Sequence, residues 1–111
     1  MGRSYLGEFE ELVLLTVAHW QGGAYGAALL QDIQARTGRM VILSAIHVVL
    51  YRLEAKGLVT SSVGGATAER GGRRKRLYAI TADGIRTLSE IRQLREALWQ
   101  LIPPSMLPAP L

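Results

Sequence analysis

The chain has 111 residues, the length of one small domain, and its two Trp, four Tyr and one Phe leave the core to aliphatic side chains. Thirteen Lys and Arg against nine Asp and Glu give a formal net charge of +4, which suits a polyanionic partner but is also compatible with ordinary solubility. The absence of Cys excludes a disulfide framework, a thiolate metal site and a Cys nucleophile, and two isolated His residues argue against a metal site or a metal cofactor.

Three helices are predicted in the first half of the chain. Residues 8–20 are apolar around most of the helix circumference and carry acids in the first turn, where the helix dipole favours them. Residues 25–37 form an amphipathic pattern that ends at Gly38, a residue suited to a C-terminal cap. Residues 44–56 start at Ser44, a suitable N-cap, and repeat apolar residues with the i, i+3, i+4, i+7 spacing of a helix.

A β-hairpin with a basic loop is predicted next, over residues 58–81. Its two strands, 58–63 and 76–81, are rich in β-branched residues and flank a glycine-rich segment. Five bases and no acid occur between positions 70 and 76, so the remaining residues hold eight bases against nine acids, a net charge of −1. The whole positive excess therefore lies in one loop, whose guanidinium groups suit phosphate oxygens. The alternative for an isolated run of charges is a merely solvated loop.

A fourth helix is predicted over residues 82–102, with Thr81 as its N-cap. Its apolar residues follow a heptad spacing, which requires another helix to cover them. All four prolines lie in the segment 103–111, which we expect to be a frayed or extended tail.

Three helices followed by a hairpin with a basic tip is the element order of a winged helix-turn-helix. We therefore predict a mainly α fold with a small β-hairpin: a winged helix-turn-helix domain over residues 1–81 and an additional C-terminal dimerisation helix over residues 82–102. In this fold the third helix enters the major groove of DNA, and the hairpin contacts neighbouring phosphates or the minor groove.

Six segments carry a resemblance to the PadR family of bacterial transcriptional regulators, in the family's order and spacing. They are LGEFEELVLL (6–15), YG (25–26), TGR (37–39), LYRLEAKGLV (50–59), RGGR (70–73) and YAITADG (78–84). The resemblance covers about residues 6–100, and the short last helix is similar to that of the small subgroup, whose members dimerise through it and the first helix. It implies a homodimeric repressor that binds a palindromic operator, with recognition helices about 34 Å apart.

The resemblance and the pattern of charges together define the candidate site residues. The candidates for DNA binding are Tyr25, Ser44, Ala45, His47, Val48, Tyr51, Arg70, Arg73, Arg74, Lys75 and Arg76. The candidates for the dimer interface are Phe9, Leu12, Leu88, Ile91, Leu94, Leu98, Trp99 and Leu101. The family's usual Gly-Thr and Tyr-Pro pairs are replaced in the recognition helix by Ser44-Ala45 and His47-Val48, so the usual Tyr and Thr contacts to DNA do not transfer unchanged.

Several of these residues allow two interpretations. His47 is either a donor to a phosphate or base edge, or an ordinary surface histidine, while Ala45 and Val48 suit a thymine methyl group. Tyr25 either anchors helix packing or extends its hydroxyl to a phosphate. Arg52 either contacts a phosphate or, as we expect, forms a structural ion pair with Glu54 or Asp32.

Trp20 and Trp99 are candidates for an effector site. Some drug-sensing members of the family stack flat aromatic ligands on a Trp of the last helix, so the resemblance implies an aromatic small-molecule effector. The alternative, and the more frequent role of tryptophan on an apolar helix face, is packing in a core or interface.

No enzyme is predicted, because the sequence has no nucleophile elbow, no phosphate-binding glycine loop and no carboxylate pair near a histidine. No apolar run reaches the about 18 residues of a membrane helix, and the first residues do not form a targeting leader, so we expect a cytoplasmic protein without a membrane partner. Two alternatives to duplex DNA binding remain: a winged-helix module that binds RNA, and a dimerisation module whose basic loop contacts an acidic protein.

Overall fold

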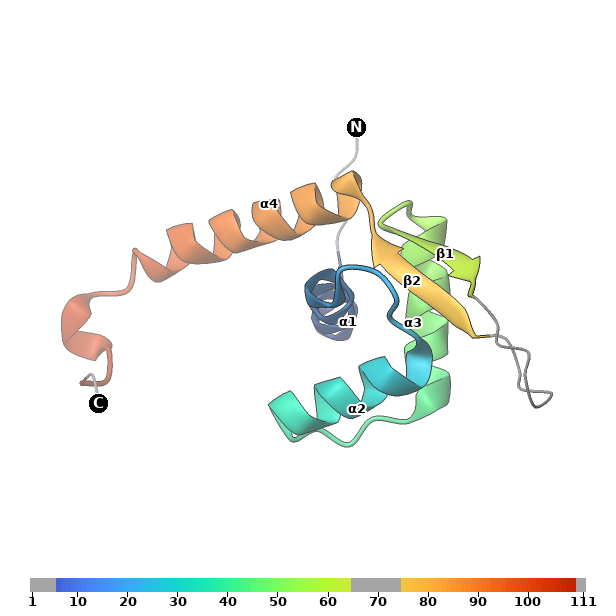
Figure 1. Ribbon diagram of the computed structural model, residues 1–111. Coiled ribbons are helices and arrows are strands. Elements are labelled where there is room, and N and C mark those ends of the chain that lie inside the picture. The colour runs from blue at the N-terminus through green and yellow to red at the C-terminus, as the bar shows by residue number, and fades with distance from the viewer. Residues whose placement is uncertain (1–5, 65–74, 110–111) are drawn as a thin grey trace.

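The computed structural model describes residues 6–64 and 75–109 (Figure 1). Within these two ranges the chain folds into four α-helices and one two-stranded antiparallel hairpin, the combination that the sequence predicts. The elements are α1 (Glu8–Trp20), α2 (Gly26–Thr37), α3 (Leu43–Ala55), β1 (Val59–Val63), β2 (Arg76–Ile80), α4 (Ala82–Trp99) and the short 3-10 helix η2 (Pro104–Met106). In the hairpin, Val59 lies opposite Ile80 and Val63 opposite Arg76.

Local caps set the ends of the helices. Gly38 ends α2 with a φ of 72°, in the left-handed region that glycine enters without a steric penalty. The Thr81 hydroxyl accepts a hydrogen bond from the Gly84 N–H at 2.9 Å and so begins α4. Both caps are confirmed predictions. At α1 the Gly7 N–H donates to Glu10 Oε1 at 3.1 Å, which satisfies one of the otherwise unpaired N–H groups near the helix start.

Two local predictions are wrong. Ser44 is not the cap of α3, because the helix begins one residue earlier at Leu43, with Ile42 as the capping position. The Gln34 side chain donates to the Val41 carbonyl at 3.0 Å and fixes the connection, so the chain turns helical before Ser44. The tail is not simply frayed or extended, since Pro104 starts η2, where the fixed φ of proline suits the first turn.

The core lies between α1, α2, α3 and the inner face of the hairpin, and it is almost wholly aliphatic, as the composition predicts. Tyr78 is its one aromatic side chain among the described residues that is classed as buried. The Tyr78 N–H also donates to the Ala24 carbonyl at 2.7 Å, so the loop between α1 and α2 adds a single bridge to the edge of β2. This bridge, which no local pattern predicts, ties the start of α2 to the hairpin.

Helix α4 leaves this core and extends to one side of it (Figure 1). The molecule is 60 Å long, and its radius of gyration of 16.7 Å exceeds the about 13 Å of a compact chain of this length. At the root of α4, a Cβ atom on Gly84 would lie 2.4 Å from the Leu58 carbonyl oxygen, so only glycine allows the helix to start so close to β1. Within the described residues, no helix has the length and apolar character needed to cross a membrane.

Candidate nucleic-acid interface

Helix α3 has one buried and one exposed face. Ile46, Val49, Leu50 and Leu53 are buried in the core. Ser44, His47, Val48 and Tyr51 are exposed on the other side, and Ala45 is half-buried at the edge. All five candidate DNA-binding residues of α3 therefore keep at least part of their surface available, on the face of the helix that the core does not use.

We use the term wing for the described part of the hairpin, residues 59–64 and 75–80. The N-terminus of α2 lies between α3 and the base of this wing. A Cβ atom on Gly26 would lie 2.5 Å from His47 Nε2, so the His47 ring packs directly on the first turn of α2. On the other side, the Lys75 ammonium lies 4.1 Å from the centre of the Tyr25 ring, a cation–π contact. Tyr25 and Lys75, which are 50 positions apart in the sequence, thus meet, because the Ala24–Tyr78 bridge holds the start of α2 beside β2.

The first turns of α2 and α3 contain no acidic residue. The first turn of α1, by contrast, carries Glu8, Glu10 and Glu11, and that of α4 carries Asp83. A helix N-terminus has unpaired N–H groups and a partial positive charge, which bind phosphate well when no carboxylate competes. The N-termini of α2 and α3, the helices of the candidate interface, are therefore suited to bind phosphate, whereas those of α1 and α4 are not.

Arg76, at the base of the wing, is held by neighbouring side chains. Its guanidinium donates to the Ser61 hydroxyl at 2.9 Å, and that hydroxyl donates to Glu54 Oε2 at 2.8 Å. Burial raises the pKa of the neighbouring Tyr78 phenol, with Arg76 lowering it and Glu54 raising it. Arg76 is thus partly engaged within the chain, whereas the candidates Arg70, Arg73 and Arg74 lie outside the described residues.

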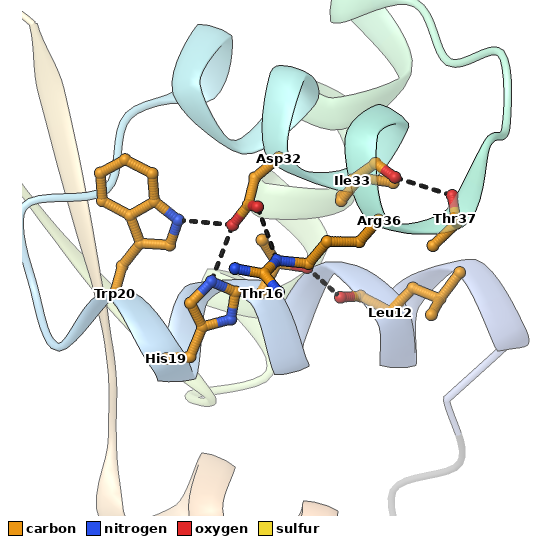
Figure 2. Close-up of polar contacts among 8 residues, drawn as sticks. All are labelled: Leu12, Thr16, His19, Trp20, Asp32, Ile33, Arg36 and Thr37. Carbon is orange, nitrogen blue, oxygen red and sulfur yellow. Dashed lines mark hydrogen bonds and ion pairs between the residues drawn. The ribbon is translucent and has the colours of Figure 1, made fainter.

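Asp32 joins α1 to α2 and accepts three hydrogen bonds (Figure 2). Its carboxylate binds His19 Nε2 at 2.7 Å, Trp20 Nε1 at 3.0 Å and Arg36 Nε at 2.7 Å. Burial raises the pKa of Asp32, but the hydrogen bonds from Trp20, Arg36 and His19 outweigh it, so the pKa lies below its ordinary value. The ionised form of Asp32 is therefore favoured by folding.

This arrangement corrects the expected role of Arg52. Asp32 is occupied by the three donors just described, and Glu54 accepts a hydrogen bond from Ser61. In the described parts of the chain, no ion pair joins Arg52 to either carboxylate, so the predicted structural pair is wrong. Arg52 stays exposed at the end of α3, with its cationic group on the same helix as the candidate site.

We expect Asp32→Ala to lower the free energy of unfolding at pH 7 by about 1–3 kcal/mol, because three hydrogen bonds to a mostly buried carboxylate are lost. The folded-state pKa is lower than the ordinary value of 3.8, so this stabilisation is present above that value and is lost as the pH falls through the folded pKa. Urea unfolding followed by circular dichroism from pH 3 to pH 7 measures the difference, which should shrink toward acid.

Asp83→Ala is the matched control, since Asp83 is exposed and, among the residues that the structure describes, forms a single ion pair, with Arg86 at 2.6 Å. We expect it to cost less than about 1 kcal/mol. Equal losses in the two variants, or an Asp32 effect that grows toward acid, would contradict a stabilising role of Asp32.

Three carboxylates at the start of α1 connect this helix to the rest of the fold. Glu8 binds Arg39 at 2.7 Å, Glu10 binds Lys56 at 3.2 Å, and Glu11 binds Arg95 at 2.7 Å. Burial raises the pKa of Glu10, but the hydrogen bonds from the Gly7 N–H and from Lys56 lower it by more than burial raises it. The pKa of Glu10 is therefore below its ordinary value. The first turn of α1 thus fixes the connection before α3, the end of α3 and the direction of α4.

The candidate dimer residues fall into two groups. Phe9 and Leu88 pack against the chain's own core, and Leu12 and Ile91 are half-buried. Leu94, Leu98, Trp99 and Leu101 are exposed. Helix α4 ends at Trp99, so Leu101 lies in the turn that follows it, and the prediction of a helix that extends to residue 102 and includes Leu101 is wrong. The exposed group gathers on the distal half of α4 and the turn that follows it, and this half extends away from the core.

The two tryptophans of the candidate effector site have different surroundings. Trp20 lines an open pocket of about 650 Å³ between the end of α1 and α2. The pocket is lined by His19, Trp20, Tyr25, Ala28, Gln31, Asp32 and Arg36. Trp99 is not part of this lining and is exposed at the end of α4. Within one chain, therefore, the two candidates do not form a shared pocket.

Comparisons with known proteins agree with this architecture. The model of the PadR-like family of transcriptional regulators matches residues 14–90. A PadR-like regulator from Bacillus cereus superposes with a TM-score of 0.67 at 20% identity, over 83% of this chain and 84% of that chain. A PadR family regulator from Eggerthella lenta gives 0.66 at 26% identity, over 84% and 80%. One from Clostridium difficile gives 0.68 at 17% identity, over 84% and 93%.

No curated protein matches the chain significantly. The family model nevertheless spans most of the sequence, from the second half of α1 through α2, α3 and the hairpin to the first half of α4. The winged-helix fold predicted from the order of the elements is thereby confirmed. The chain belongs to the PadR-like family of transcriptional regulators.

Proposed function

We propose that this regulator is a homodimeric repressor that binds a palindromic operator in duplex DNA. Helix α3 enters the major groove, and the basic segment 70–76 contacts phosphates or the minor groove. The observation that carries the proposal is the junction at the start of α2, where Tyr25 lies under Lys75 at 4.1 Å and Gly26 packs on His47. This junction joins wing and recognition helix into one face whose two helix N-termini have no acid.

Electrostatics support a phosphate partner for this face. Between Asp32 and Glu54 the sequence has no acid and three arginines, of which Arg36 pairs with Asp32 and Arg39 with Glu8. The excess charge of the whole chain lies in the basic segment 70–76. Phosphate contacts from bases, hydroxyls and helix N-termini fix the register of a protein on DNA, while side chains in the groove supply specificity. The junction supplies groups of all three kinds, as the Lys75 ammonium, the Tyr25 hydroxyl and the first turn of α2.

A mobility-shift and protection assay on the DNA upstream of the protein's own gene tests the proposal. We expect protection of two half-sites whose centres are about 10 base pairs, or a multiple, apart, with one dimer bound per palindrome. Single- and double-stranded RNA of the same sequence serve as controls. Preference for RNA would support the RNA-binding alternative, and absence of binding to all three probes would support the protein-interaction module.

We also propose that an aromatic small molecule releases the repressor from DNA. The pocket beside Trp20 and the exposed Trp99 supply aromatic surface for such a ligand. Binding of such a ligand can be measured by titrating the tryptophan fluorescence with a planar cationic dye. Absence of quenching at tens of micromolar dye would argue against an effector of this class. The proposed regulator acts in the cytoplasm and without catalysis.

A further inference from the structure

We propose that α3 recognises the methyl groups of thymines, so that the operator half-sites carry thymines where the start of this helix meets the major groove. The inference rests on the proposed function and specifies its target. In the major groove, thymine differs from the other bases by its C5-methyl group, which an apolar side chain recognises by contact.

From its start to Tyr51, the exposed face of α3 lacks the side chains that usually distinguish guanine, adenine and cytosine. Arg or Lys binds guanine, Asn or Gln binds adenine, and Asp or Glu binds cytosine. From position 40 to position 51 the sequence contains none of these six residue types. The polar groups on this face up to that point belong to Ser44, His47 and Tyr51, and the exposed Arg52 and Glu54 follow only at the C-terminal end of the helix.

None of these three polar residues is well placed to select one base. The His47 ring packs on the first turn of α2, with Nε2 2.5 Å from the position of a Gly26 Cβ, so this nitrogen faces protein. A serine hydroxyl such as that of Ser44 pairs with several bases without selecting one. Tyr51 is two turns farther along α3, while base contacts in this class of fold come from the first residues of the recognition helix.

Apolar side chains occupy the positions where base-specific polar side chains are absent. Ile42, Ala45 and Val48 follow an i, i+3, i+6 spacing at the start of α3 and therefore lie along one side of it. Ile42 is 67% exposed and Val48 50% exposed, and Met40, in the preceding connection, is 93% exposed. Apolar side chains so exposed at the front of a regulator's recognition helix gain free energy when a methyl group covers them.

The charges around this stripe favour DNA over a protein partner. The nearest charged positions along the chain are Arg39, which pairs with Glu8 at 2.7 Å, and the exposed Arg52, and Lys75 lies across the α2 junction. Arg52 and Lys75 thus place positive charge beside the stripe, which suits the phosphates that flank a thymine in the groove.

The test replaces the thymines of the protected half-sites by deoxyuridine, one position at a time, and measures the dissociation constant. Deoxyuridine keeps every hydrogen-bonding group and removes only the methyl. Burial of one methyl is worth about a fourfold change in affinity, so a palindrome altered in both half-sites should bind about 16-fold more weakly. The Val48→Ala variant should bind the natural operator more weakly and lose much of this sensitivity to deoxyuridine.

Ile85→Ala is the matched control, because Ile85 is also 50% exposed but lies on α4. It should keep the full sensitivity. Unchanged affinity of the wild type for every deoxyuridine operator would overturn the inference while leaving DNA binding intact. Absence of any duplex binding would instead overturn the proposed function. A change in the oligomeric mass of Val48→Ala would identify the stripe as a protein contact and would also overturn the inference.

Discussion

A variant that carries Leu94→Glu and Leu98→Glu is expected to be a monomer of about 12.1 kDa and to bind the operator about 100-fold more weakly than the wild type. Leu94 is 61% exposed and Leu98 57% exposed on the half of α4 that does not pack on the core. In a two-fold interface each substitution acts twice. Burial of a leucine contributes about 1.5–3 kcal/mol, and a buried unpaired carboxylate costs more, so the dimer should not survive.

Loss of the dimer weakens DNA binding because the second half-site is then no longer engaged as an intramolecular event. Linking two binding modules raises overall affinity by about 10²- to 10⁴-fold. Light scattering gives the mass, and a mobility shift on the protected palindrome gives the affinity. Both should change together, and the variant should keep the circular dichroism and melting behaviour of a folded winged-helix domain.

The matched control is Ser89→Glu with Gln93→Glu, which adds the same two charges to exposed positions of α4. These residues lie about a third of a turn or more away from the seam formed by Leu94 and Leu98. The control should remain a dimer of normal affinity. If the Leu variant stays dimeric, the interface lies elsewhere. If it becomes monomeric but binds the palindrome with unchanged affinity, dimerisation is not required for recognition.

The second large effect is expected when Arg73 and Arg74 are replaced by Ala. Both lie outside the described residues, so the expectation rests on their charge and on their place between β1 and β2 in the chain. Each phosphate contact contributes about 0.9 to the slope of log affinity against log salt concentration. Removal of two such contacts from each wing of a dimer should therefore reduce the slope by about 3 to 4.

The measurement is a series of dissociation constants between 50 and 200 mM salt, where the wild type should lose affinity by about tenfold or more. Arg86→Ala with Arg92→Ala removes the same charge from α4, where these side chains pair with Asp83 and Glu96. This control should keep the wild-type slope. Equal slopes in all three proteins would mean that the wing loop does not contact the DNA backbone. Arg76 is left unchanged because it also binds Ser61.

Local sequence rules were sufficient for most of the secondary structure. The predicted first helix matches α1, and the caps at Gly38 and Thr81 are in place, because capping depends on residues within one turn of the helix end. The prediction of Ser44 as the cap of α3 is wrong because a contact from outside the local segment sets the start of this helix. There a contact from Gln34, seven positions before Val41, fixes the chain and overrides the preference of serine for the cap.

The order of the elements, the aliphatic core and the location of the excess charge follow from the amino-acid sequence alone, because apolar periodicity and composition are local properties. Which of those residues meet depends on the tertiary structure. The Lys75–Tyr25 contact, the packing of His47 on Gly26 and the Ala24–Tyr78 bridge join segments far apart in the chain. No sequence pattern predicts them, since they depend on how helices and hairpin pack around a shared core, and that packing assembles the proposed DNA-binding face.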